Sequence, residues 1–144
     1  MRALQAAKHA CEASGWTLTN LQLQKILYIA HMVHLGRTGQ PLIDDQFFEA
    51  WDYGPVLPSV YRHVSGFGSR PIANVFAVIE DANHPAEIES IRNAVGQFAN
   101  IEPFQLVQIL HDERSAWRGF YNPNFRNTVI PTAAVLNEYR NRFQ

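Results

Sequence analysis

Apolar residues recur every three or four positions along most of the chain, which is the spacing of one face of an α-helix. This pattern predicts helices in residues 1–13, 85–98 and 103–110. The broadest apolar stripe lies in residues 20–36, and its breadth predicts a central helix that is covered on more than one side. We expect one core to contain Leu23, Ile26, Leu27, Ala30, Val33 and Trp51.

Capping residues, glycines and prolines mark where the helices begin and end. Thr19 and Gln22 form the sequence T-x-x-Q, in which each side chain can bind the free backbone N–H of the other residue. Gly36 is the expected end of the central helix, because glycine readily adopts the left-handed conformation that follows many helices. Prolines suit the first helical turn, so further helices are expected to open at Pro58, Pro85, Pro103 and Pro131.

Two segments do not follow the helical pattern. Residues 37–58 contain several glycines and prolines around the apolar piece Phe47–Trp51, which indicates tight turns. Residues Val75–Ile79 are apolar throughout and are compatible with either a short strand or the start of a helix. The prediction is a mainly α single domain over residues 1–144, with about six helices and either no sheet or one short strand pair.

Composition and charge narrow the classes of function. Charged residues make up 17% of the chain and the net charge is −1, so no basic field favours nucleic acid as a partner. The longest apolar runs are far shorter than the about 20 residues that a membrane-spanning helix needs. Cys11 is the single cysteine and cannot form an intrachain disulfide, which is typical of a reducing compartment. We therefore expect a cytoplasmic protein with neither a membrane nor a nucleic acid as its partner.

A metal site is the first chemical possibility. His31 and His34 are three positions apart and can share one helix face, and carboxylates that could add ligands follow at Asp44, Asp45 and Glu49. No H-E-x-x-H sequence and no pair of cysteines supports a metal. Histidines that pack or face solvent without a metal are the favoured interpretation, so no metal and no cofactor is predicted.

Catalytic interpretations have equally little support. Cys11 could act as a nucleophile with a histidine base, but it falls on the apolar face of its helix, where cysteine usually packs as a small hydrophobe. Glu49 and Asp52 could form an acid–base pair, and the alternative is one solvated carboxylate beside one that caps a turn. Phosphate-binding and nucleophile-elbow motifs are absent. No catalytic residues are predicted.

Arginines and aromatic residues are interleaved in the last third of the chain. Such a mixture is typical of surfaces that bind single-stranded nucleic acid and also of protein interfaces. A structural role is favoured over both, with Trp117 in the core and the arginines on helix surfaces; a protein interface ranks second and a nucleic-acid surface third. The residues concerned are Arg114, Arg118, Arg126, Arg140 and Arg142 with Trp117, Phe120, Tyr121, Phe125 and Tyr139.

Three blocks of sequence have a distinctive order and spacing. Residues 21–28 read L-Q-L-Q-K-I-L-Y, residues 48–61 contain F-x-A-W-x-x-G-P-V-x-x-x-V-Y, and residues 106–117 contain a histidine, a glutamate and a tryptophan. These blocks resemble the signatures of the Panacea domain, an antitoxin family that includes the SocA-like proteins. The chain departs from the family pattern at Gln22, where lysine is usual, and at Leu110 and Ala116, where threonine and proline are usual. The positions that match are Leu23, Gln24, Lys25, Leu27, Tyr28, Ala50, Trp51, Gly54, Pro55, Val56, Tyr61, His111 and Trp117.

The resemblance covers about residues 4–142 and implies a function by contact. Panacea domains neutralise a cognate toxin by binding it, and some members act as adaptors that deliver the toxin to a cellular protease. The resemblance therefore implies an antitoxin that is not an enzyme, and we expect a stand-alone module without a DNA-binding domain. The alternatives are a small enzyme and a nucleic-acid-binding regulator, encoded on a phage or another mobile element.

The second block also has a physical interpretation. Gly54 permits a positive φ that other residues find costly, and Pro55 then fixes its own φ, so the block predicts a rigid corner against the central helix. Trp51 and Tyr53 bring large apolar area to this corner. Exposed residues beside the second and third blocks are predicted to contact the partner, namely Asp52, Tyr53, Arg62, Arg114 and Arg118.

Overall fold

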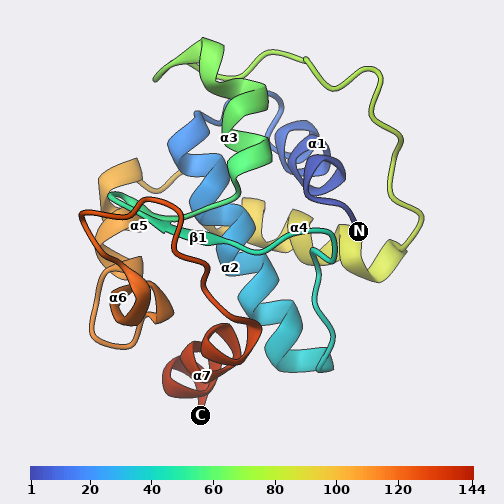
Figure 1. Cartoon of the computed structure of the whole chain (residues 1–144). Helices are drawn as coiled ribbons and strands as arrows, with labels where there is room; N and C mark the ends of the chain where they lie inside the picture. The colour runs from blue at the N-terminus through green and yellow to red at the C-terminus, as the bar shows by residue number, and fades with distance from the viewer.

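The computed structural model describes residues 1–144 and arranges them around helix α2, which spans Asn20–Thr38 (Figure 1). Helices α1 (Ala3–Ala13), α4 (Pro85–Phe98) and α7 (Thr132–Phe143) pack against it from different sides. None of the helices has the length and apolar character that crossing a membrane requires. The remaining helical elements are α3 (Pro58–Val64), the 3₁₀ turn η1 (Ser65–Phe67), α5 (Pro103–Leu110) and α6 (Ala116–Phe120). The mainly α prediction is confirmed, with seven α-helices.

Helix α2 is buried along almost its whole length, as the breadth of its apolar stripe predicts. The predicted capping box is present, because Gln22 N–H donates to Thr19 Oγ1 and Thr19 N–H donates to Gln22 Oε1. The core prediction is confirmed for Leu23, Ile26, Leu27 and Ala30. It is only partly correct for Val33, which is half-buried at the edge of the core.

Strands β1 (Glu49–Trp51) and β2 (Gly54–Val56) form an antiparallel hairpin, so the strand-pair alternative is confirmed. Trp51 pairs with Gly54, which leaves Asp52 and Tyr53 as a two-residue turn. The placement of Trp51 in the core is wrong. Successive side chains of a strand point to opposite faces, so burial of Ala50 directs the Trp51 side chain outward.

The prediction that α2 ends at Gly36 is also wrong. The helix continues to Thr38, and Gly39 ends it with a left-handed φ of 75°. Gly36 lies against the ring of Tyr139 in α7, and a Cβ at this position would overlap that ring. The glycine therefore permits close packing of two helices that are far apart in the sequence.

Prolines stand at or just before the start of four helices. Pro58, Pro85 and Pro103 occupy the first helical turn as predicted, whereas Pro131 precedes α7 as its N-cap.

Residues Val75–Ile79 form neither a strand nor a helix. They belong to the long connection from η1 to α4 that follows the outside of the molecule in Figure 1. Phe76 anchors this connection, because its side chain is fully buried against Trp16 and His63.

Candidate functional site

Side chains of α2 hold the β-hairpin in place. Lys25 Nζ donates a hydrogen bond to the carbonyl oxygen of Pro55 at 3.0 Å, and the backbone N–H of Leu57 donates to Gln24 Oε1 at 2.9 Å. Gln24 is itself oriented by Asn20, whose Oδ1 accepts from Gln24 Nε2 at 3.1 Å. A strand edge otherwise leaves its backbone groups unpaired. Gln24 and Lys25, both in the first sequence block, thus provide hydrogen-bond partners along β2.

The side-chain amine of Lys25 is fully buried beneath the hairpin turn. Burial lowers the pKa of its ammonium group to about 7. Gly54 lies over the Lys25 side chain. Its φ is 115°, so the predicted positive φ at this glycine is confirmed. A Cβ at Gly54 would lie 3.1 Å from Lys25 Cε and 3.2 Å from Lys25 Nζ. Both the backbone conformation and the space beside Lys25 therefore call for glycine.

Replacing Gly54 by alanine is expected to reduce the free energy of unfolding by about 1–3 kcal/mol, since a non-glycine residue is strained at this φ. Urea denaturation of the two proteins measures the difference. Gly66→Ala is the matched control, because no atom lies near its Cβ position and its φ is not positive. A Gly54→Ala variant as stable as the parent would contradict the special role of this backbone position.

A stack of aromatic rings supports the hairpin turn from its other side. The rings of His111 and Trp117 lie parallel with centroids 3.7 Å apart, and Tyr121 stacks on the far face of Trp117 at 4.6 Å. Trp117 Nε1 donates to the carbonyl oxygen of Trp51 at 2.6 Å, which ties the third sequence block to the second. His111 Nε2 is buried without a hydrogen-bond partner. Burial, and next the nearby charge of Lys25, lower the pKa of His111.

The C-terminal helix is attached to α2 through one buried carboxylate. Glu138 Oε1 accepts from the hydroxyl group of Tyr28 at 2.6 Å and from the backbone N–H of Ala116 at 2.9 Å. Its Oε2 accepts from Arg142 Nε at 2.7 Å. Burial and the charge of Glu138 raise the pKa of Tyr28. Sequence reasoning missed Glu138, because no local pattern distinguishes it from a solvated glutamate.

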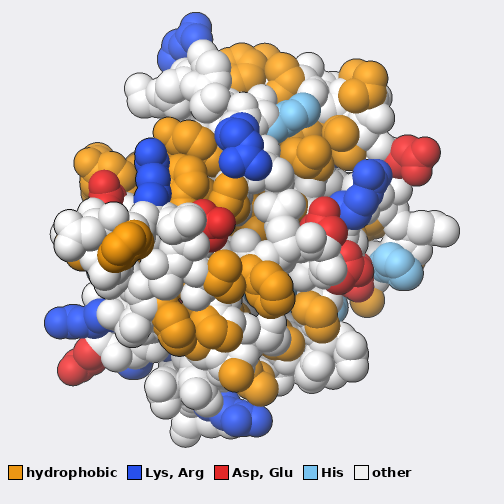
Figure 2. Space-filling view, in the orientation of Figure 1, with side chains coloured by type: hydrophobic (Ala, Val, Ile, Leu, Met, Phe, Trp, Pro, Cys, Tyr) orange, Lys and Arg blue, Asp and Glu red, His pale blue; other side chains and the backbone are white.

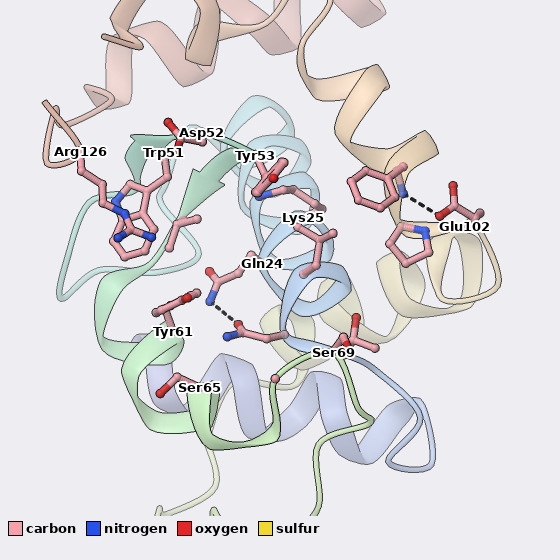
Figure 3. Close-up of a pocket in the computed structure, with 17 residues that line it drawn as sticks. Gln24, Lys25, Trp51, Asp52, Tyr53, Tyr61, Ser65, Ser69, Glu102 and Arg126 are labelled. Atoms are coloured by element: carbon pink, nitrogen blue, oxygen red, sulfur yellow. Dashed lines mark hydrogen bonds between the residues drawn. The ribbon is translucent and has the colours of Figure 1, made fainter. Parts of the chain in front are cut away.

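A cavity of about 440 Å³ opens beside the hairpin, and we refer to it as the hairpin pocket (Figure 3). Its position follows from the contacts above, since Gln24 and Lys25 of α2 line its inner side. Its walls combine side chains from the hairpin, α3, α5 and the segment before α7. The aromatic and charged residues among them are Trp51, Asp52, Tyr53, Tyr61, Glu102, Phe104 and Arg126.

Two aromatic residues at the pocket are widely exposed. Tyr53 is 59% and Phe104 is 56% exposed, and their rings meet edge to face at 6.3 Å. Across the pocket, the Arg126 guanidinium lies over the Trp51 ring, 4.1 Å from its centroid (Figure 3). The sequence does not predict Phe104 as a site residue, and it indicates Arg126 only as a member of the arginine–aromatic set. Their meeting at the hairpin depends on tertiary contacts.

The predicted partner-contact residues fall in different places. Asp52 and Tyr53 share the hairpin turn, where Asp52 Oδ1 accepts from the hydroxyl group of Tyr121 at 2.7 Å. Arg118 is exposed on α6, and Arg114 is exposed before α6 in an ion pair with Asp112. Arg62 lies on α3 beside a separate hollow, so the structure does not bring it to the hairpin pocket.

The arginine–aromatic set does not form one surface. Trp117 belongs to the core, as the favoured interpretation has it. Arg142 is largely buried and paired with Glu138 and Asp112, whereas Arg126 lies on Trp51. On the face shown in Figure 2, Lys and Arg side chains stand apart from one another among apolar patches. This distribution does not favour a nucleic-acid surface on that face.

The residues considered for a metal site have separate protein partners, although His31, Asp44 and Asp45 line one hollow. His31 Nδ1 accepts from the backbone N–H of Ile43 at 3.2 Å, while His34 Nδ1 lies 3.1 Å from Ser90 Oγ. Burial lowers the pKa of His31 to about 4 and also lowers that of His34. Asp45 accepts from the backbone N–H of Ala3, and the other two carboxylates also have separate partners: Asp44 pairs with the N-terminal ammonium group, and Glu49 accepts from Trp51 Nε1.

The residues considered for catalysis have structural partners as well. Burial raises the pKa of Cys11 to about 12, so this residue is a thiol at neutral pH. Glu49 and Asp52 accept hydrogen bonds from Trp51 and Tyr121, respectively. One cluster that sequence reasoning missed joins His9 and Glu12 of α1 with Asp81. Two of its members also have protein partners, since Lys8 pairs with Asp81 and His9 Nε2 accepts from the backbone N–H of Ala82.

Comparison with known proteins assigns the chain to a family. The family described as "Antitoxin SocA-like, Panacea domain" matches residues 23–118, a range that includes the second and third sequence blocks and residues 23–28 of the first. The chain belongs to this family. It is 33% identical over 110 residues to the protein named antitoxin SocA of Caulobacter vibrioides (strain NA1000 / CB15N). The match covers 69% of this chain and 58% of that protein. No solved structure matches the chain.

Proposed function

We propose that this protein is a cytoplasmic antitoxin that neutralises a cognate toxin by direct protein–protein binding, without catalysis. Membership of the SocA-like Panacea family carries the proposal. The geometry supports it, because the side chains considered for catalysis are buried or bound to protein partners. Neutralisation by masking the toxin and neutralisation by delivering it to a cellular protease are two forms of the same contact.

The hairpin turn and its surroundings are the proposed contact surface. Interfaces draw much of their affinity from a few Tyr, Trp and Arg residues in well-packed positions. Tyr53 and Phe104 expose aromatic area here, and Asp52 and Arg118 add charges on neighbouring elements. The turn that carries Asp52 and Tyr53 is held by Lys25 and Trp117, so these side chains are presented by a rigid support. Rigid presentation lowers the entropy lost on binding.

Co-expression with the product of the adjacent gene, the proposed toxin, tests the function. The expected result is restored growth and a complex that co-purifies. Unchanged toxin abundance would indicate masking, whereas toxin loss that requires a cellular protease would indicate delivery. No protection and no complex would overturn the proposal. Turnover of a small molecule by the purified protein would favour an enzyme instead.

Tyr53→Ala and Arg118→Glu are expected to weaken toxin binding by about 2 kcal/mol, or roughly thirtyfold, if these residues are interface anchors. Both side chains are exposed, so the thermal midpoint should stay close to that of the parent. Calorimetric titration and growth protection measure the effect. Arg92→Glu on α4 is the matched control, because Arg92 is also exposed and lies away from the hairpin. Full affinity in both variants would place the toxin on another face.

A further inference from the structure

Arg126 is a cation without a partner of opposite charge. Its guanidinium forms none of the ion pairs of the protein and none of its side-chain hydrogen bonds, and it contacts Trp51 and Tyr61 through cation–π interactions instead. Stacking uses the face of a guanidinium group and leaves the N–H donors at its edge available. Arg126 therefore brings unused hydrogen-bond donors to the hairpin pocket.

The ring under Arg126 is fixed by other contacts. Trp51 Nε1 donates to Glu49 Oε1 at 3.0 Å, and the Trp51 carbonyl oxygen accepts from Trp117 Nε1. Tyr61 lies against the Trp51 ring with centroids 4.9 Å apart. A cation on such a fixed platform needs little reorganisation to bind an anion, because its position is already restricted.

The carboxylates beside the pocket are engaged elsewhere. Glu102 uses Oε1 for the backbone N–H of Phe104 and Oε2 for that of Gln105, and so caps α5. Asp52 Oδ1 accepts from Tyr121. Arg126 and these carboxylates line the same cavity without forming an ion pair. The side of the pocket at Arg126 is therefore open to an external anion.

The opposite side of the pocket carries apolar side chains beside the carboxylate of Glu102, which caps α5. Figure 3 shows Glu102, the N-cap of α5, across the cavity from Arg126 and Trp51, with Lys25 and Gln24 between them. Pro103 and Phe104, which follow Glu102 in α5, also line the cavity. Tyr53 extends this apolar side at the rim. The volume of about 440 Å³ suits one or two side chains of a peptide. A carboxylate at one end and an apolar side chain at the other would match these two sides.

We propose that the hairpin pocket binds an acidic segment of the partner protein. An Asp or Glu carboxylate of this segment pairs with the edge of the Arg126 guanidinium, and a neighbouring apolar side chain packs against Tyr53 and Phe104. That the segment belongs to a partner protein rests on the proposed function. That the segment is acidic rests on charge complementarity at Arg126. Two parallel N–H···O bonds make an arginine–carboxylate pair strong and directional.

A random peptide library displayed on phage, selected on the full chain, tests the assignment. Enriched peptides should carry Asp or Glu within a few positions of Phe, Leu, Ile or Trp. A synthetic peptide of this kind should lose affinity by about ten- to a hundredfold on Arg126→Gln, since hydrogen bonds to charged groups are worth about 1.5–3 kcal/mol. Arg126→Lys should lose less, because the charge is kept while the planar edge is lost. Arg92→Gln is the control and should bind like the parent.

A double-mutant cycle locates the contact. Changing the peptide Glu to Gln should weaken binding to the parent but add little to the loss already caused by Arg126→Gln. Enriched peptides without acidic residues, or equal binding by the parent and Arg126→Gln, would overturn the assignment. Competition by N-acetylglutamate or inorganic phosphate as strong as that by the peptide would also overturn it, since the pocket would then be a small-anion site.

The peptide and growth experiments fail independently of each other. Acidic peptides that need Arg126, together with no toxin bound and no protection, would leave the pocket assignment standing and overturn the antitoxin proposal. Full toxin neutralisation by Arg126→Gln, together with peptides that bind equally well without Arg126, would support the antitoxin proposal and overturn the pocket assignment. Thermal unfolding of each variant shows whether it is folded, which is expected because Arg126 is exposed.

Discussion

Glu138→Ala is expected to lower the free energy of unfolding by about 3–5 kcal/mol, because it breaks a buried ion pair with Arg142, which keeps only its pairing with Asp112, and leaves buried donors unsatisfied. The Glu138 side chain is fully buried, and that of Arg142 is 8% exposed. The same carboxylate also accepts from Tyr28 and from the backbone of Ala116. Its loss would therefore leave three donors without their acceptor at the junction of α2, α6 and α7.

Chemical denaturation followed by far-UV circular dichroism measures this loss. The control is Asn137→Ala, an exposed neighbour on the same helix, which should change stability by no more than about 0.5 kcal/mol. Tyr28→Phe removes a single donor and should cost about 1 kcal/mol. A Glu138→Ala variant that loses less than about 1 kcal/mol would show that the carboxylate does not hold α7 on α2.

Lys25 is expected to make the stability of the protein rise with pH above neutrality. Its ordinary pKa is 10.5, and burial lowers it to about 7 in the folded protein. Between these values the unfolded chain holds a proton that the folded protein has released, so the free energy of unfolding increases with pH. The cost of burying the charged amine is fully present below about pH 7 and is relieved as the pH rises. The slope approaches about 1.4 kcal/mol per pH unit.

Comparison with Lys25→Met isolates this contribution, because the other titrating groups are common to both proteins. From about pH 7 to about pH 9, the parent should gain roughly 2 kcal/mol relative to the variant. Loss of the hydrogen bond to Pro55 adds a cost to the variant that does not depend on pH. Lys8→Met is the control; Lys8 pairs with Asp81 near the surface, so this variant should follow the parent. A difference between parent and Lys25→Met that stays constant with pH would show that the buried amine remains charged.

The matching positions of the family signature are mostly internal supports in this structure. Lys25, Gly54 and Trp117 lie behind the hairpin turn. They fix the position of the turn and do not themselves form its outer surface. The side chains available to a partner are their neighbours, Tyr53 and Arg126 among them. A signature position and a contact position are therefore different things here. The proposed experiments accordingly change exposed neighbours to test binding and signature residues to test stability.

Features that depend on neighbouring residues could be predicted from the amino-acid sequence. The spacing of apolar residues identified α2 as the central helix, and the Thr19–Gln22 capping box identified its beginning. Gly54 followed by Pro55 indicated a turn with positive φ, and the three blocks indicated the family. These signals are local because helical periodicity, capping and turn conformation are determined within a few residues.

Which of these elements meet depends on contacts between distant parts of the chain. Gly36 resembles a helix end in the sequence, but it makes room for Tyr139, which lies about a hundred residues further on. Trp51 resembles a core residue, but the strand alternation that buries Ala50 turns it outward to meet Arg126. Glu138 carries no local signal, because its partners come from α2, α6 and α7. The hairpin pocket and the buried network both consist of contacts between distant segments, and such contacts have no counterpart in the spacing of residues along the chain.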